Sequence, residues 1–277
     1  MATAYYAPTD LDEALALLAR GAVSVVAGGT DWFPARGRAP VNVDVLDLTR
    51  MASLRGIGWE DDALCIGAAA TWSDVAAAPL PPAFDGLKAA AREVGGVQIQ
   101  NAGTLAGNLC NASPAADGVP PLLALDAEVE LASANGRRRL PLDRFVLGPR
   151  RTALGTGEIV VALRLPRPPA HARGAWEKLG ARRYLVISIA MTAVVVGVDE
   201  GGRIDHARVA VGACAPMARR LHELERDMLG RRPEEVAVTA AHLAPLAPID
   251  DVRADAACRR EVVPHQIRRA IRRAVGG

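Results

Sequence analysis

Apolar and polar positions follow a helical periodicity in some segments of the chain and a strand periodicity in others. Leu11, Leu15 and Leu18 recur at the spacing of one helix face. The sequence TDLD at residues 9–12 resembles a capping box that opens this helix, and Gly21 is a typical stop signal. The β-branched run VSVV and the alternating run VNVDVLDL follow it. The first fifty residues therefore predict a helix, a strand, a glycine turn and a second strand.

The same two periodicities predict the helices and strands that follow, up to about residue 170. Strands are expected at 63–70, 127–133 and 158–166, and short helices at 71–78, 84–94 and 119–126. The segment at 167–175, RPPAHARGA, is rich in proline and small residues and is the best candidate for a linker. The pattern predicts an α+β chain in two parts.

Beyond the linker the pattern changes. Strands are expected at 176–180, 185–198 and 204–214, the last two joined as a hairpin across residues 199–202. From residue 218 the pattern is mostly helical and predicts helices at 218–229, at 233–243 and at the C-terminus. The apolar run at 185–198 has about fourteen residues, too few to cross a bilayer.

Composition narrows the class of protein. Half of the 277 residues are hydrophobic and the net charge is +2, as is ordinary for a globular protein. Basic residues are almost all arginine, acids are interspersed with them, and aromatic residues make up only 4%. Nucleic-acid binding needs clustered charge and stacking aromatics, so we expect no nucleic-acid partner.

The spacing of the four cysteines indicates reduced thiols rather than ligands of a metal site. Cys65, Cys110, Cys214 and Cys258 lie far apart and form no CxxC pair. A zinc or iron–sulfur site on this chain alone is therefore not expected. Dispersed cysteines behind an N-terminus without a signal-peptide pattern predict reduced thiols and a cytoplasmic location.

The familiar catalytic motifs are absent. The chain has no GxxxxGK[ST], no GxGxxG after a strand and no GxSxG. Its five histidines share no ligand-like spacing. We therefore assign no catalytic residue and no metal ligand to this chain.

Two glycine-rich segments carry the remaining chemistry. One follows a predicted strand, at residues 27–31, and the other is the polar run QIQNAGTLAGNLCNASPAAD at residues 98–117. Glycines after a strand let main-chain N–H groups converge on a phosphate without help from lysine or arginine. Asp117 is suited to grip a pair of ribose hydroxyls. For the first segment alone, turn glycines and side-chain caps are the better explanation, but both segments together favour an extended ligand with a central pyrophosphate.

The two segments also resemble a known family. VVAGGTD followed by QIQNAGTLAGNLCNASPAAD resembles the flavoprotein, or medium, subunit of the molybdenum hydroxylases, which include xanthine dehydrogenase, aldehyde oxidoreductase and carbon monoxide dehydrogenase. The later segments WEKLGARRYLVISIAMTAVV and PIDDVRADAACRREVVPHQIRRAI are similar to that family as well. The resemblance implies a p-cresol methylhydroxylase-type FAD-binding domain at 1–170, in two α+β subdomains at about 1–55 and 56–170. A smaller C-terminal α+β flavoprotein domain would follow at 171–277.

The resemblance also implies which residues bind FAD. Those expected to wrap the pyrophosphate are Ala27, Gly28, Gly29, Thr30 and Asp31. Those expected in a second phosphate loop are Gly103, Thr104, Gly107 and Asn108, with Ser113 and Asp117 along the ribityl and ribose side. Residues expected near the flavin ring or the adenine are Leu165, Lys178 and Ser188. The chain departs from the family pattern at Gln100, Ala102 and Ala106, and a side chain at 106 could crowd the pyrophosphate or demand an unfavourable φ.

In this family the flavin subunit does not touch the organic substrate. The resemblance implies a large partner subunit that holds molybdopterin and a small partner subunit that carries two [2Fe–2S] clusters, as a dimer of heterotrimers. Electrons would pass from the clusters to FAD and on to NAD⁺, oxygen or a quinone. The basic C-terminal helix is a candidate for part of a subunit interface, although basic residues that complement the C-terminal end of a helix dipole explain its arginines equally well.

Two other interpretations stay open at this point. One is a stand-alone flavin oxidase or reductase of the same fold, with Cys110 as a possible covalent tether to the flavin. The other is a flavin-free scaffold subunit, for which Ala106 is the single hint.

Overall fold

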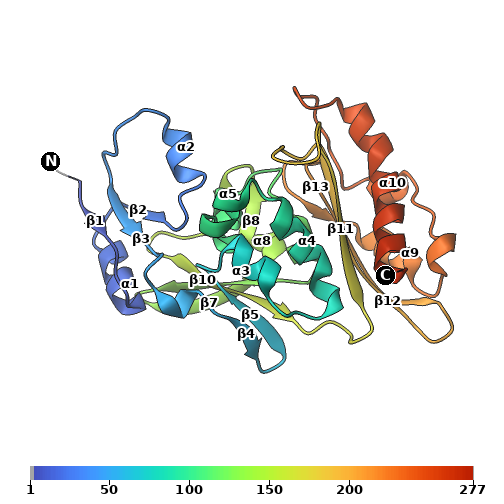
Figure 1. Ribbon diagram of the computed structural model, residues 1–277, viewed down its shortest axis with the longest axis horizontal. Helices are drawn as coiled ribbons and strands as arrows, with labels where there is room; N and C mark the ends of the chain where they lie inside the picture. The colour runs from blue at the N-terminus through green and yellow to red at the C-terminus, as the bar shows by residue number, and fades with distance from the viewer. Residues whose placement is uncertain (1–2, 277) are drawn as a thin grey trace.

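The computed structural model describes residues 3–276, and its layers follow one another along the long axis (Figure 1). The first layer is a parallel sheet with strand order β1-β3-β2, covered by helix α1. Its elements are β1 (Tyr5–Tyr6), α1 (Leu11–Ala19), β2 (Val23–Val26) and β3 (Asp44–Asp47). The cap of α1 is Asp10, whose carboxylate accepts the N–H groups of Asp12 and Glu13. The predicted helix is confirmed, but it is Asp10 rather than Thr9 that caps it.

The second layer is an antiparallel sheet of order β4-β5-β10-β6-β7. Its strands are β4 (Ile57–Glu60), β5 (Ala63–Gly67), β6 (Glu128–Ser133), β7 (Gly136–Pro141) and β10 (Ile159–Pro166). Buried residues on one face of this sheet join the core of the first layer, and residues on the other face join the largest core. Sequence patterns missed β4 and β7, whose residues are half-buried or exposed and carry little apolar signal.

Short helices lie over the second face of that sheet. They are α3 (Trp72–Ala77), α4 (Asp85–Glu93), α5 (Val97–Ala102), α6 (Leu105–Asn111) and α7 (Val119–Ala124). Of these, α3, α4, α6 and α7 join the largest core, and α5 packs on α3. Smaller elements complete this part of the chain: α2 (Trp32–Arg36), α8 (Leu142–Phe145), β8 (Val146–Gly148) and β9 (Arg151–Thr152). Thr71 caps α3 in a full capping box with Asp74, as its sequence predicts.

The C-terminal layer is an antiparallel sheet of order β11-β12-β13-β14 with helices on its outer face (Figure 1). Its elements are β11 (Arg173–Leu179), β12 (Ala190–Val198), β13 (Ile204–Gly212), β14 (Arg219–Arg220), α9 (His222–Met228) and α10 (Ala256–Val275). The predicted hairpin between β12 and β13 is confirmed. None of the helices in the described residues is both long and apolar enough to cross a membrane.

Three predictions for the C-terminal part were wrong. The helix expected at 218–229 begins only at His222, after the two-residue strand β14. Residues 185–189 belong to no strand, and β12 begins only at Ala190. Residues 233–243 form two single 3₁₀ turns, Pro233–Glu235 and Ala241–Leu243, in place of a helix. There the N–H of Thr239 donates to Nδ1 of His242, at 3.1 Å, and His242 is buried against Asp227. A local hydrogen bond from the main chain to His242 and the contact of this buried histidine with Asp227 thus replace the helical pattern that the sequence favours.

The C-terminal sheet packs so closely against the second layer that main-chain atoms of the two parts are in contact. A Cβ added to Gly174 on β11 would lie 2.2 Å from the carbonyl oxygen of Ala83. A Cβ added to Gly86 on α4 would lie 3.0 Å from the carbonyl oxygen of Ala175. The predicted linker therefore joins two parts that share a close interface, and its last residues already form β11.

We expect Gly174→Ala to lower the free energy of unfolding by about 2 kcal/mol, because the added methyl group must push two backbones apart. Urea denaturation of the full chain measures this. Gly58→Ala is the matched control, since a Cβ at Gly58 meets nothing within 4 Å. Equal losses in the two variants would contradict the close interface.

Candidate functional site

A cavity of about 820 Å³ lies where the layers meet. Its wall is built by residues 27–31 after β2, by residues of the second glycine-rich segment between Thr104 and Asp117, and by residues 185–187 before β12. The volume is within the usual range of small-molecule and cofactor sites, about 300–1,000 Å³. The two segments singled out by sequence thus lie in one cavity.

The two glycine-rich segments touch each other through their main chains. A Cβ at Gly28 would lie 1.8 Å from the carbonyl oxygen of Ala102, an impossible distance for a real side chain. A Cβ at Gly103 would lie 3.2 Å from Oγ1 of Thr30. Glycine at position 28 is therefore required by the contact itself, and the turn interpretation alone does not explain it.

The first segment presents main-chain N–H groups that have no partner. Within residues 3–276, no hydrogen bond uses the N–H of Gly28, Gly29, Thr30 or Asp31. Gly29 has φ +67°, in the left-handed region that favours glycine. Unpaired N–H groups at such a bend form a concave, partly positive surface. This geometry suits a phosphate oxygen.

The second segment differs from the expected loop, because it folds into α5 and α6. The N–H of Gly103 donates to the carbonyl of Ile99 at 2.7 Å, and the N–H of Asn108 donates to the carbonyl of Thr104 at 3.1 Å. The N–H of Gly107 donates to Oγ1 of Thr104, which caps α6, at 3.0 Å. These three N–H groups therefore already have hydrogen-bond partners within the segment.

What the second segment offers is side-chain atoms. Oδ1 of Asn108 is buried at the cavity and has no hydrogen-bond partner in the described chain. Such an orphaned acceptor is costly unless a ligand or water supplies a donor. Ser113 also lines the cavity. Ala106 does not crowd the site, because it lies inside α6 with its side chain in the hydrophobic core and without a positive φ.

Asp117, Lys178 and Ser188 come together although they are far apart in sequence. Nζ of Lys178 lies 3.0 Å from Oδ2 of Asp117, and Oγ of Ser188 donates to Oδ1 of Asp117 at 2.6 Å. Asp117 lines the cavity, whereas the other two lie behind it. Burial raises the pKa of the Asp117 carboxyl above its ordinary value, and the charge of Lys178 opposes that shift. Lys178 and Ser188 thus hold a cavity residue and do not form the wall.

Leu165 is placed elsewhere. It lies on β10 opposite Leu64 of β5, fully buried in the largest hydrophobic core. The structure does not bring its side chain to the cavity.

Sequence reasoning missed several residues of the wall. The ring of Trp32 is fixed by a hydrogen bond from Nε1 to Oγ of Ser24, 2.7 Å long, and the guanidinium of Arg36 stacks 4.5 Å from the ring centroid. Arg150 reaches the cavity from 39 positions away and donates to Asn111. Trp32 and Arg36 follow the first segment directly in the sequence, and this was the one signal that could have placed them at the cavity. No local sequence feature indicates that Arg150 lies there.

Cys110 lies in the cavity wall, but its chemistry does not favour a covalent flavin. Its side chain is exposed at the cavity, and desolvation by the neighbouring protein atoms raises the pKa of the thiol. The thiolate is the nucleophilic form. The thiol is therefore protonated at neutral pH.

Comparison with known proteins defines the class. The family model "FAD binding domain in molybdopterin dehydrogenase" matches residues 1–168, and "CO dehydrogenase flavoprotein C-terminal domain" matches residues 177–274. The chain therefore belongs to the family of FAD-binding medium subunits of the molybdenum hydroxylases. This confirms the predicted fold class, an FAD-binding domain followed by a C-terminal domain, and identifies the chain as an FAD-binding subunit of an oxidoreductase.

Individual relatives cover most of the chain. It is 32% identical over 274 residues to the carbon monoxide dehydrogenase medium chain of Hydrogenophaga pseudoflava, covering 96% of this chain and 95% of that one. It is 33% identical over 234 residues to the nicotinate dehydrogenase FAD-subunit of Eubacterium barkeri, covering 82% and 79%. The solved structure of carbon monoxide dehydrogenase from Hydrogenophaga pseudoflava matches with a TM-score of 0.88 at 30% identity, covering 100% of this chain and 98% of that chain.

We expect Gly28→Ala to raise the FAD dissociation constant by about 100-fold, because the methyl group separates the two segments at a cost of about 3 kcal/mol. Fluorescence titration of the flavin-free chain measures this. Gly56→Ala, where a Cβ meets nothing within 4 Å, is the control. Unchanged affinity in Gly28→Ala would show that the contact does not shape the site.

We expect Asp117→Asn to lower the free energy of unfolding by about 3 kcal/mol, because it leaves the ammonium of Lys178 buried without its counter-ion. The side chain of Lys178 is only 5% exposed. Urea denaturation measures the loss, with the exposed Asp62→Asn as control. If both variants unfold like the unaltered protein, the ion pair does not stabilise the fold.

Proposed function

We propose that this chain carries FAD as the electron-transfer subunit of a molybdenum hydroxylase or dehydrogenase complex. Electrons would come from [2Fe–2S] clusters on a small partner subunit, and NAD, oxygen or a quinone would accept them. When bound, FAD supplies the exchange between one-electron and two-electron transfer. The contact of Gly28 with the main chain at Ala102 carries the proposal, since it places unpaired N–H groups beside the second segment.

The residues of the cavity fit FAD. The N–H groups of residues 28–31 would hold the pyrophosphate, where neither lysine nor arginine is needed. Asp117 retains lone pairs beyond the two hydrogen bonds that it accepts, and these would accept from ribityl or ribose hydroxyls. Oδ1 of Asn108 would take a further donor. The protein's part is to bind and orient the cofactor.

The proposal also includes partner subunits and the limits of two domains in this chain. A large subunit would hold molybdopterin, and three kinds of chain would assemble as a dimer of heterotrimers in the cytoplasm. The names of the relatives, a medium chain and an FAD-subunit, support a multi-subunit complex. The described residues contain no group of three or more His, Cys, Asp or Glu side chains placed to hold a metal ion. The FAD-binding domain would comprise residues 1–170 and the C-terminal domain residues 171–277, close to the limits of the two family models.

The test is purification of the tagged chain from its own host, followed by analysis of metals, flavin and companion chains. We expect about one acid-releasable FAD per chain, a large companion with molybdenum and a small companion with iron and acid-labile sulfide. FAD without either companion would favour a stand-alone oxidase or reductase. Absence of flavin from a folded chain would favour a scaffold subunit.

A further inference from the structure

Ser188 connects the cavity wall to a charged cluster that lies outside the cavity. Its hydroxyl donates to Oδ1 of Asp117 at 2.6 Å. Its carbonyl accepts a hydrogen bond from Nη1 of Arg253 at 2.7 Å. Ser188 is fully buried, so neither group exchanges its partner for bulk water. One residue therefore links a cavity carboxylate to a guanidinium of the C-terminal part.

Arg253 is itself held from two sides. Its Nη2 lies 2.6 Å from Oδ2 of Asp251 and its Nε lies 3.3 Å from Oδ1, in the forked geometry that arginine and carboxylate favour. Arg259, which is fully buried at the start of α10, donates from Nη2 to Oδ1 of Asp251 at 2.7 Å. The hydrogen bonds from Arg253 hold the pKa of the Asp251 carboxyl far below its usual range. The cluster thus stays charged at neutral pH and fixes Arg253 in place.

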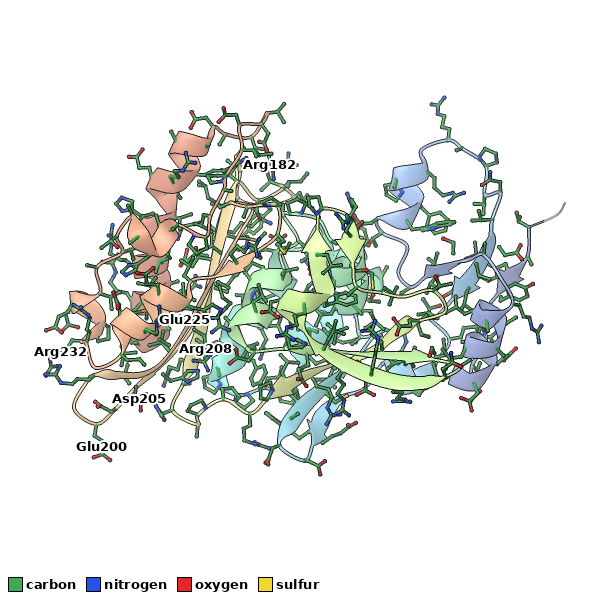
Figure 2. The ribbon with its side chains drawn as sticks, turned by 180° about the vertical axis from the view of Figure 1, so that it is seen from behind. Arg182, Glu200, Asp205, Arg208, Glu225 and Arg232 are labelled. Carbon is green, nitrogen blue, oxygen red and sulfur yellow. The ribbon has the colours of Figure 1, made fainter. Side chains whose placement is uncertain are left out.

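The segment just before Ser188 forms part of the cavity wall and has little support of its own. Residues 185–187 line the cavity without belonging to a helix or strand. The side chains of Leu185 and Ile187 are 54% and 64% exposed, and Leu185 has φ +53°, which is costly for leucine. Arg182 donates a hydrogen bond to the carbonyl of Leu185. It lies at the end of the C-terminal sheet that is opposite the hairpin with Glu200 (Figure 2). Ser188 fixes the other end of this segment.

We propose that Arg253 is a positioning residue for the FAD site. It fixes Ser188, and through Ser188 it sets both the orientation of Asp117 and the path of residues 185–187, without reaching the cavity itself. The inference rests on the assignment of the cavity to FAD. It makes FAD affinity depend on a charge cluster in the C-terminal part of the chain, which no feature of the glycine-rich segments indicates.

The experiment uses the full chain freed of FAD, with Arg253→Met as the main variant and Arg260→Met, an exposed arginine on the same helix as Arg259, as control. We expect Arg253→Met to raise the FAD dissociation constant by about tenfold, as for the loss of a charged hydrogen bond. Arg260→Met should bind like the unaltered chain. Hydrogen exchange of residues 185–189 should speed up in Arg253→Met and not in the control.

A double-mutant cycle with Ser188→Ala separates positioning from general loss of stability. Ser188→Ala removes the hydroxyl bond to Asp117 but keeps the carbonyl that Arg253 binds, and Ser188→Thr should restore affinity. If Arg253 acts through Ser188, the double variant should bind FAD clearly better than the product of the two single losses predicts. A general weakening of the fold would make the losses multiply.

Three results would overturn the inference: tight FAD binding by Arg253→Met, multiplying losses in the cycle, or unchanged exchange at residues 185–189. If Arg253→Met does not fold, Arg253→Lys takes its place, since lysine cannot form the fork to Asp251 while bonding Ser188. Unchanged FAD affinity together with unchanged hydrogen exchange at residues 185–189 in a folded Arg253→Lys would equally contradict the inference. Failure of the unaltered chain to bind FAD would instead refute the assignment of the cavity.

Discussion

The contact between Gly28 and the main chain at Ala102 is the constraint on which the cavity depends. The first glycine-rich segment follows a strand of the parallel sheet, while the second folds into helices on the antiparallel sheet. Only a residue without a side chain lets the two backbones approach this closely. Because they do, unpaired N–H groups of the first segment face the same cavity as Asn108 and Asp117. A larger residue at position 28 would separate these donors and acceptors.

The C-terminal layer contributes to the site mainly from behind. Asp117 belongs to the first part of the chain, but its hydrogen-bond partners Lys178 and Ser188 belong to the second. A buried carboxylate is unfavourable as an anion unless a positive charge and hydrogen-bond donors offset its desolvation. The close packing at Gly174 keeps the two parts in fixed register. The interface between the two parts is therefore also an electrostatic support for the cavity.

Sequence patterns predicted the core elements well and the irregular ones poorly. The helix and strands of the first fifty residues, the capped helix at Thr71 and the hairpin of β12 and β13 all follow from periodicity and capping. The stretch at 98–117 was expected as a polar loop, yet it contains most of α5 and all of α6. Helix α6 forms because Thr104 caps it and its Leu105 and Leu109 reach the core. The helix expected at 233–243 fails because buried His242 engages the main chain there.

The sequence by itself determined most of the regular core elements, the two glycine-rich segments and, through them, the family and its cofactor. Such features are local, since they depend on spacing and on the freedom of glycine within a few residues. The tertiary structure alone decided which N–H groups stay unpaired, and that Lys178 and Ser188 stand behind Asp117. It also decided that Arg253 supports Ser188. The hydrogen bonds that Asp117 and Ser188 make with these partners join residues 61, 71 and 65 positions apart. No local pattern specifies such partners, because folding selects them by burying charged and polar groups where they can satisfy one another.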